Sequence, residues 1–396
     1  MMGCALALGF ALPGAAAQNV ASANEKPVVI GYEWSLHSSI LNEERPISVH
    51  LPDGYKRSSS RYPVLYVLDG EQEFVPMVAV ADALPWAFRG PNLIVVAIHN
   101  VHRTHDLTTP WTSSVAPGQA QWMVSKAGGA DLFLAFLQKE LVPEIDRRYR
   151  TTPYRVLLGH SLGGLFILHA FASSPELFRA WVALSPPAFW NGDASVTDAV
   201  QLFTKQPNLK STLFVSRAGK EFDDTPRAYD KLDEALRLRA PASLRWQTKL
   251  IDGEDHGTSL LPAAQAGLEF VFLDWRLPSF VFDQGLDSSE QYYRGLSAEY
   301  GFDIPIPEGE ISALARRAPS AQERQRVYQR YTQLYPNSID AFAGLAESLE
   351  RDGNLSGAND AYDKALSLAV EQKDPRAAEL KKQQEALSNR IPAQQH

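Results

Sequence analysis

Short apolar runs alternate with amphipathic helical patterns from near the start of the chain to about residue 275. Val64–Leu68 and Leu93–Ile98 are continuous apolar runs, which is typical of strands buried on both faces of a parallel sheet. Further strands are predicted at Val28–Trp34, Ile47–Leu51, Val156–Leu158, Ala180–Leu184, Thr212–Val215 and Leu244–Ile251. Helical spacing occurs between them, notably at Leu132–Ile145 and Asp230–Arg239. This alternation predicts an α/β fold with a mostly parallel sheet and helices on both of its faces.

The pattern changes in residues 278–309, a connection that contains proline, glycine and acidic residues. Helices are predicted beyond it at Ser320–Leu334, Ile339–Asp352, Ser356–Ala369 and Pro375–Asn389. Within Phe342–Leu366 the spacing of large and small residues resembles a tetratricopeptide repeat. One repeat cannot bury its own faces, so we expect this tail to dock on the α/β body or to pair with another chain. A stabilising appendage and a surface for a protein partner or self-association both remain open.

The first residues differ from the rest of the chain. Cys4–Pro13 is almost wholly apolar, and the small residues Ala15–Ala17 precede Gln18, although no lysine or arginine precedes the apolar run. This resembles a secretory signal peptide over residues 1–23, and it predicts a secreted or periplasmic protein. Cys4 is the single cysteine, so the mature chain would have neither disulfides nor a thiol nucleophile.

Composition narrows the class of protein. With 396 residues, 45% hydrophobic and 21% charged, the chain reads as an ordinary globular protein with a large core. The formal net charge of −8 argues against nucleic acid as a partner, because there is no basic excess to neutralise phosphates. No further apolar run has transmembrane length, so no transmembrane anchor is expected. The predicted domains are residues 24–282, the α/β domain, and 283–396, the linker and helical tail.

The stretch Val156–Phe166 carries the clearest chemical signal. An apolar run leads into Gly159-His160-Ser161-Leu162-Gly163, a Gly-x-Ser-x-Gly turn, and an apolar helical run follows at once. That order is typical of a nucleophile elbow, in which a strained serine lies between a strand and a helix. Gly159 and Gly163 are expected to be glycines because side chains there would collide with the strand or helix they approach.

A serine hydroxyl needs a general base, and the base needs an orienting acid. Three histidines follow Ser161, and His256 alone lies in a loop between the last predicted strand and a helix. We therefore predict His256 as the base. The acid is expected after the preceding strand, where Glu221, Asp223 and Asp224 are the candidates and Glu221 is preferred.

An oxyanion hole requires two N–H donors. The backbone N–H of Leu162, directly after the serine, is one candidate. The other is expected in the loop after Val64–Leu68, at Gly70 or Glu71, and Glu71 is preferred.

These motifs resemble the putative-esterase family of α/β-hydrolases. The segments that carry the resemblance are Ile40–Arg45, Tyr62–Gly70, Gly128–Asp131, Glu140–Ile145 and Gly159–Gly164. The family includes enterobactin-type siderophore esterases, feruloyl and acetyl esterases, formylglutathione hydrolase and mycolyltransferases. The chain is most similar to the exported siderophore-esterase branch, which includes forms with a C-terminal tetratricopeptide segment. The resemblance implies an α/β-hydrolase fold, Ser161 and His256 as catalytic residues, and a glutamate acid as in mycolyltransferases.

Two further side chains are substrate-binding candidates. Arg103 matches a family arginine and is expected either to hold an anionic or catecholate group or to tie down its loop by pairing with Asp106. Trp190, in a segment that departs from the family pattern, is expected either to line the acyl pocket or to pack as a core aromatic. His99, His102 and His105 are spaced like metal ligands but lie on a loop without a carboxylate framework, so no metal is expected.

The sequence thus predicts an exported serine esterase that acts on a small or aromatic acyl ester, with a siderophore ester among the candidates. It is expected to work through an acyl-enzyme, without a cofactor. Acyl transfer to an alcohol, as in mycolyltransferases, is an alternative. A non-catalytic binding protein that works through its helical tail is another.

Overall fold

The computed structural model describes residues 26–57, 59–114, 121–222 and 224–390. The predicted signal peptide, residues 1–23, and the acid candidate Asp223 lie outside the described residues. One compact unit begins at Gly31 and includes every helix and strand given below.

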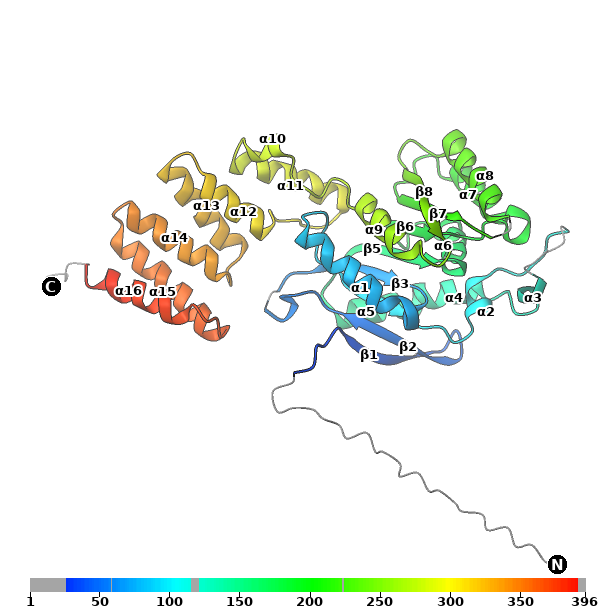
Figure 1. Cartoon of the computed structure of the whole chain (residues 1–396), viewed down its shortest axis with the longest axis horizontal. Helices are drawn as coiled ribbons and strands as arrows, with labels where there is room; N and C mark the ends of the chain where they lie inside the picture. The colour runs from blue at the N-terminus through cyan, green and yellow to red at the C-terminus, as the bar shows by residue number, and fades with distance from the viewer. Residues whose placement is uncertain (1–25, 58, 115–120, 223, 391–396) are drawn as a thin grey trace, which may run out of the picture. The chain divides into compact units, whose positions relative to one another are not determined.

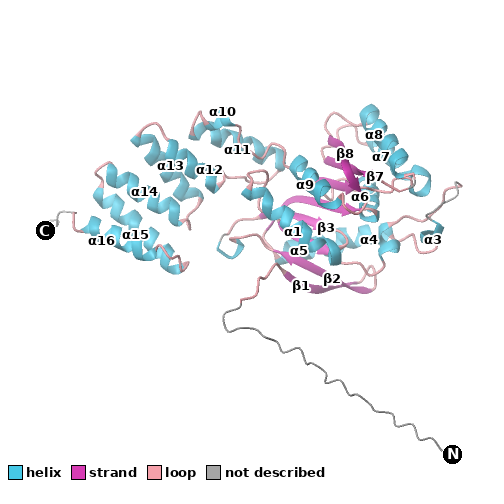
Figure 2. Cartoon of the chain, in the orientation of Figure 1, coloured by secondary structure: helices cyan, strands magenta, loops and turns pink. Residues whose placement is uncertain are grey.

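An eight-stranded sheet forms the centre of the α/β body (Figures 1 and 2). Its order is β1-β2-β4-β3-β5-β6-β7-β8, with β1 and β2 antiparallel to their neighbours and the other pairs parallel. The strands are β1 (Tyr32–Ser38), β2 (Glu43–His50), β3 (Tyr62–Val67), β4 (Ile94–Ile98), β5 (Thr151–His160), β6 (Ala180–Leu184), β7 (Thr212–Lys220) and β8 (Arg245–Asp255). The predicted α/β fold is confirmed: this is a mostly parallel, α/β-hydrolase-like sheet.

Helices cover both faces of the sheet because successive strand residues point to opposite sides. Val64 and Tyr66 of β3 pack into one core with α4 to α8, whereas Leu65 and Val67 pack into a second core with α1 and α9. The body helices are α1 (Gly70–Trp86), α2 (Arg103–Leu107), α3 (Gln121–Val124), α4 (Ala130–Phe136), α5 (Val142–Arg148), α6 (Leu162–Ser173), α7 (Trp190–Lys205), α8 (Thr225–Arg239) and α9 (Leu260–Val271), with a short 3-10 turn at Tyr55–Arg57.

Several boundaries differ from the sequence expectation; β2, β5, β7 and β8, for example, each extend four or five residues beyond one end of the predicted strand. The first strand begins at Tyr32 instead of Val28. The helix predicted at Leu132–Ile145 is divided into α4, a π-helical segment at Leu137–Leu141 and α5. The segment after β4, where His99, His102 and His105 are expected on a loop, contains the short helices α2 and α3. Apolar periodicity predicts which residues of a segment are buried, but it does not predict where the backbone hydrogen bonding of a helix or strand changes.

The predicted connection at residues 278–309 is largely helical, which corrects the sequence expectation. It contains α10 (Ser279–Phe282), α11 (Leu286–Tyr300) and the start of α12 (Glu308–Arg317). The buried residues of α11 recur at helical spacing, but two of them are tyrosines and one is a serine, so the stripe reads as polar. Tyr300 packs its ring 5.0 Å from that of Tyr154 in β5, and its hydroxyl donates to the carbonyl of Val271 (3.1 Å).

The remaining tail consists of α13 (Ala321–Leu334), α14 (Ile339–Arg351), α15 (Leu355–Glu371) and α16 (Ala377–Ser388). Side chains at Ser320, Ser338 and Asn354 cap the first three of these helices. A Cβ at Gly344 would lie 2.1 Å from the ring of Tyr328, so glycine allows α13 and α14 to approach closely. Buried residues of α11, α12 and α13 share the core that contains α1 and α9. The repeat-like helices α14 and α15 have most of their buried residues in a separate core that they share with α16, so the expectation that the repeat docks on the body stays a prediction.

Across the described ranges, no helix combines the length and the apolar character needed to span a bilayer.

Candidate active site

Ser161 lies at a sharp turn between the end of β5 and the start of α6. Its backbone has φ 58° and ψ −120°, a conformation that non-glycine residues rarely adopt. Its N–H donates to the carbonyl of Leu184 at the end of β6 (2.9 Å). The following residue, Leu162, begins α6, so its backbone N–H belongs to the first helical turn and has no acceptor within the helix.

Close packing at this turn explains two of its glycines. A Cβ at Gly159 would lie 2.8 Å from the carbonyl carbon of Gly163, and one at Gly164 would lie 2.8 Å from the carbonyl oxygen of Leu184. At Gly163 the nearest atom would be the Asp69 Oδ2 at 3.4 Å, an ordinary contact. The sequence predicts a collision at Gly163 as well. The structure corrects this, because the two positions at which a Cβ would collide are Gly159, which packs against the backbone of Gly163, and Gly164.

His256 follows β8, and its Nδ1 lies 2.7 Å from Oε2 of Glu221. The two side chains are 13% and 0% exposed. The Ala218 N–H donates to Oε1 of Glu221 (2.9 Å). Burial raises the pKa of Glu221, but hydrogen bonds from His256, Ala218 and Ser185 outweigh it and hold the pKa below its ordinary value. A lowered pKa favours the ionised carboxylate, which accepts a hydrogen bond from Nδ1–H of His256. In this tautomer Nε2 of His256 carries no proton and can act as a base.

The other carboxylates near this loop have different surroundings. Asp224 is 66% exposed and lies 3.6 Å from Arg227 on α8. Asp255 accepts the N–H groups of Gly257 and Thr258 (both 3.0 Å), so it closes the turn that carries His256. Among the described candidates, only Glu221 contacts His256 in this way.

The imidazole of His256 is enclosed by two rings that no sequence motif indicates. The Phe222 ring lies 4.3 Å away and the His160 ring 4.7 Å away. Nε2 of His160 lies 2.8 Å from the carbonyl oxygen of His256, and since a carbonyl only accepts, this nitrogen carries the proton. Burial, with a smaller contribution from the nearby His256, lowers the pKa of His160 to about 4. This contact joins the base loop to the residue directly before Ser161, so the elbow and the base lie together.

The turn after β3 begins α1 at Gly70. A Cβ at Gly70 would lie 2.9 Å from backbone atoms of β4, which explains the Asp-Gly sequence. The N–H groups of Gln72 and Glu73 both donate to the carbonyl of Asp69 (3.0 Å). The N–H of Glu71, the residue before Gln72, lies within hydrogen-bonding reach of the Glu71 carboxylate. That carboxylate accepts from Asn100 through Nδ2 (2.7 Å) and N–H (3.1 Å).

Arg103 pairs with a different carboxylate from the one expected. Its Nε and Nη2 donate to the two carboxylate oxygens of Asp69 (2.7 and 2.9 Å). Asp106 instead pairs with the buried Arg45 (2.6 Å). The structural alternative for Arg103 was therefore wrong in its partner, because α2 turns Asp106 inward toward β2 and Arg103 outward toward α1. The Arg103 side chain is 39% exposed.

Trp190 packs in the interior. It is 2% exposed, its Nε1 donates to the carbonyl of Thr109 (3.1 Å), and its ring meets that of Trp111 edge to face at 5.0 Å. It thereby holds the loop that follows α2.

The loop histidines have separate partners. His99 Nε2 lies 2.8 Å from the Ser48 hydroxyl, and His105 Nδ1 lies 3.1 Å from Asp106. In the part of the chain that the structure describes, no three metal-binding side chains gather around one point.

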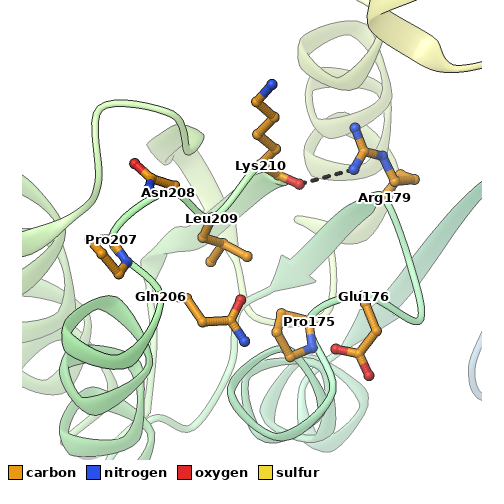
Figure 3. A pocket seen from close by; sticks show the side chains of 8 residues that line it. All are labelled: Pro175, Glu176, Arg179, Gln206, Pro207, Asn208, Leu209 and Lys210. Carbon is orange, nitrogen blue, oxygen red and sulfur yellow. Dashed lines mark hydrogen bonds between the residues drawn. The ribbon is translucent and has the colours of Figure 1, made fainter.

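A surface hollow of about 460 Å³ lies at the other end of the sheet (Figure 3). Arg179 and Lys210 line it, each shortly before the start of β6 or β7, and Arg179 donates to the Lys210 carbonyl (3.1 Å). The candidate catalytic residues instead follow the carboxyl ends of β5, β7 and β8, where ligands bind in parallel α/β sheets. The hollow is therefore separate from the candidate active site.

Comparison with known proteins identifies the family. A family model described as "Putative esterase" matches residues 38–259, more than half of the chain. The chain is 29% identical over 220 residues to the ferri-bacillibactin esterase BesA of Bacillus subtilis, and the matched region covers 51% of this chain and 75% of the relative. It is 28% identical over 250 residues to the siderophore triacetylfusarinine C esterase of Aspergillus fumigatus, with 54% and 82% covered.

A solved structure is similar over a longer stretch. The IroE-like serine hydrolase from Shewanella oneidensis superposes with a TM-score of 0.65 at 27% identity, and the match covers 77% of this chain and 99% of that one.

Proposed function

The chain belongs to the putative esterase family, a membership that supports carboxylic-ester hydrolysis, and on this basis we propose that it is an exported serine esterase acting through an acyl-enzyme. The observation that carries the proposal is the 2.7 Å contact between His256 and the enclosed Glu221 carboxylate. This pair lies close to the elbow, because His160, the residue before Ser161, donates a hydrogen bond to the His256 carbonyl.

In the proposed mechanism, Nε2 of His256 takes the Ser161 proton as Oγ attacks the ester carbonyl. His256 becomes an imidazolium, which the Glu221 carboxylate stabilises through Nδ1–H. The imidazolium then protonates the leaving alcohol. A water molecule, deprotonated by the same histidine, attacks the acyl-enzyme and releases the acid.

The negative charge of the tetrahedral intermediate is assigned to the N–H groups of Leu162 and Glu71. Both lie in the first turn of a helix, where N–H groups lack helical acceptors and the helix dipole favours negative charge. The Glu71 carboxylate, held by Asn100, lies near this donor. An oxyanion would therefore compete with it for the Glu71 N–H.

The proposed substrate is a siderophore ester or another small or aromatic acyl ester. The names of the relatives support this class, since they are esterases of bacillibactin and triacetylfusarinine C siderophores. Phe222, which is 58% exposed and adjacent to His256, offers an aromatic face at the entrance of the site. Arg103 is proposed to contact the substrate with the N–H groups that Asp69 does not use, and Trp190 to support the pocket from behind.

Labelling with a fluorophosphonate probe tests the nucleophile. Wild-type protein should be labelled at Ser161, and Ser161→Ala should not be labelled while keeping the wild-type circular dichroism spectrum. A folded wild-type protein that resists the probe would contradict the proposal. Turnover of p-nitrophenyl, feruloyl and siderophore esters then ranks the substrates, and an added alcohol acceptor distinguishes acyl transfer from hydrolysis by its product.

Two further proposals concern the ends of the chain. Residues 1–23 are proposed to be a signal peptide for a secreted or periplasmic protein, which the N-terminal sequence of the exported protein would test. The helices α14 and α15 are proposed to form a tetratricopeptide-like pair available to a protein partner. Their small buried residues, such as Ala346 and Ala365, support this arrangement.

A further inference from the structure

We propose that Asp69 is a positioning residue of the oxyanion hole. Its carboxylate is held away from the start of α1 by Arg103 and Asn100, lies against α6, and fixes the Glu71 and Leu162 N–H groups relative to each other. The inference rests on the proposed function, because it concerns the donors of that reaction.

The first observation is that Asp69 occupies an N-cap without capping. Aspartate is favoured at this position because its carboxylate accepts the N–H of the second or third helical residue. The second helical residue of α1 is Glu71, the proposed donor. An ordinary cap would therefore add a second carboxylate at this N–H, which already lies within reach of the Glu71 carboxylate. Asp69 makes no such bond, and its backbone is in the left-handed region at φ 55° and ψ 43°.

The second observation is what holds the carboxylate instead. Asp69 is 4% exposed and accepts two parallel hydrogen bonds from Arg103 (2.7 and 2.9 Å) and one from Nδ2 of Asn100 (2.6 Å). Bidentate bonds of this kind fix orientation as well as distance. Burial, with a smaller contribution from Asp69, raises the pKa of the neighbouring Glu73 well above its ordinary value. The two hydrogen bonds of Arg103 go to Asp69 and not to Glu73.

The third observation links this carboxylate to the elbow. Oδ2 of Asp69 lies 3.4 Å from the position that a Cβ would take at Gly163, the residue directly after Leu162. The same side chain thus lies between the two helix starts that carry the proposed donors. Its backbone carbonyl meanwhile accepts from Gln72 and Glu73, which sets the first turn of α1.

The fourth observation is that Arg103 has an anchor of its own. On the same short helix α2, Asp106 pairs with Arg45 (2.6 Å), and Arg45 donates to the carbonyl of His99 (2.9 Å). Arg45 and Asp106 are 1% and 3% exposed. The guanidinium of Arg103 therefore reaches Asp69 from a fixed helix, which makes it a rigid support for the carboxylate.

The test compares Asp69→Asn with the wild type in steady-state kinetics on a p-nitrophenyl ester. Asparagine tolerates the left-handed conformation and keeps the volume, but it loses the charge that holds Arg103. Removing one oxyanion donor costs roughly 100- to 1000-fold in kcat, so a displaced donor should cost about 10- to 100-fold with KM nearly unchanged. Affinity for a phenylboronic acid, whose serine adduct is tetrahedral, should fall by the same factor as kcat.

Asp146→Asn is the matched control. Asp146 in α5 pairs with Arg155 in the middle of β5 (2.6 Å), so it also joins two elements through an aspartate–arginine contact, away from the elbow. It should leave kcat and KM unchanged. Arg103→Gln disturbs the same support from the other side and keeps the test valid if Asp69→Asn does not fold. It should reproduce the loss in kcat, and KM should rise as well because Arg103 is also proposed to contact the substrate.

Two outcomes would overturn the inference while the proposed function stands. One is a folded Asp69→Asn enzyme, labelled by fluorophosphonate, that keeps wild-type kcat. The other is a higher KM with unchanged kcat, which would make Asp69 part of substrate binding. A wild-type protein that the probe does not label would remove the proposed function, and this inference with it.

Discussion

Replacement of Glu221 by glutamine is the sharpest test of the proposed acid. The variant keeps the size of the side chain but loses the negative charge 2.7 Å from His256. In the acylation step His256 becomes positively charged, so the lost interaction is specific to the transition state and should lower kcat without raising KM. A glutamine amide can also donate to Nδ1, which would place the imidazole proton on the wrong nitrogen.

The magnitude follows from charge separation and burial. The Glu221 side chain is fully enclosed and His256 is 13% exposed, so an effective dielectric constant of about 20 is appropriate. Two unit charges about 4 Å apart then interact by about 4 kcal/mol. Since each 1.36 kcal/mol changes a rate tenfold, kcat should fall by roughly 1000-fold.

The assay is hydrolysis of a p-nitrophenyl ester with Asp224→Asn as the control. Asp224 is 66% exposed and contacts a surface arginine, so its replacement should change kcat by less than about twofold. Circular dichroism and thermal melting should show both variants folded. Glu221 is not the acid if Glu221→Gln retains more than about a tenth of wild-type kcat, or if Asp224→Asn is the more damaging change.

Three further predictions concern stability. Gly164→Ala should lower the free energy of unfolding in urea by about 1–3 kcal/mol, because its Cβ would lie 2.8 Å from a β6 carbonyl oxygen. Gly163→Ala should lower it by less than about 1 kcal/mol, and equal losses in the two variants would contradict this packing. Because the pKa of His160 is lowered in the folded protein, the folded state binds fewer protons than the unfolded state, and the free energy of unfolding should fall by at most about 3 kcal/mol as the pH drops from 6.5 towards 4. His160→Gln should flatten this pH dependence, and an unchanged slope in the variant would contradict the prediction. Tyr300→Ala should cost about 3–5 kcal/mol and lower the melting temperature of body and tail together, since the ring is 2% exposed and stacks on Phe272; separate melting transitions would contradict a shared core.

Much of the fold could be read from the sequence because buried parallel strands leave a strong local signal. The prediction of Ala180–Leu184 matches β6 to the residue, and the other interior strands were located, although β5 begins five residues before its predicted start and β7 ends five residues after its predicted end. The helix α11 was missed for the opposite reason. Its buried face contains Tyr293 and Tyr300, which read as polar surface until the aromatic core around Phe272 is seen.

The same division holds at the site. The Gly-x-Ser-x-Gly turn and chain order pointed to Ser161 and His256, because both depend on local sequence and strand succession. The partner of Arg103 could not be read in this way. Its nearest carboxylate in sequence is Asp106, but the contact goes to Asp69, 34 positions away.

Local sequence patterns are sufficient to predict the strand-and-helix alternation, an elbow at Ser161 and a small set of candidate acids for His256. These features depend on local periodicity and on backbone conformations that few residue types adopt. Only the tertiary structure distinguished Glu221 from Asp224, enclosed His256 between His160 and Phe222, and turned Asp69 towards Arg103. Those contacts join residues on different strands and helices, and their geometry is set by the packing of the sheet edge, which no local pattern records.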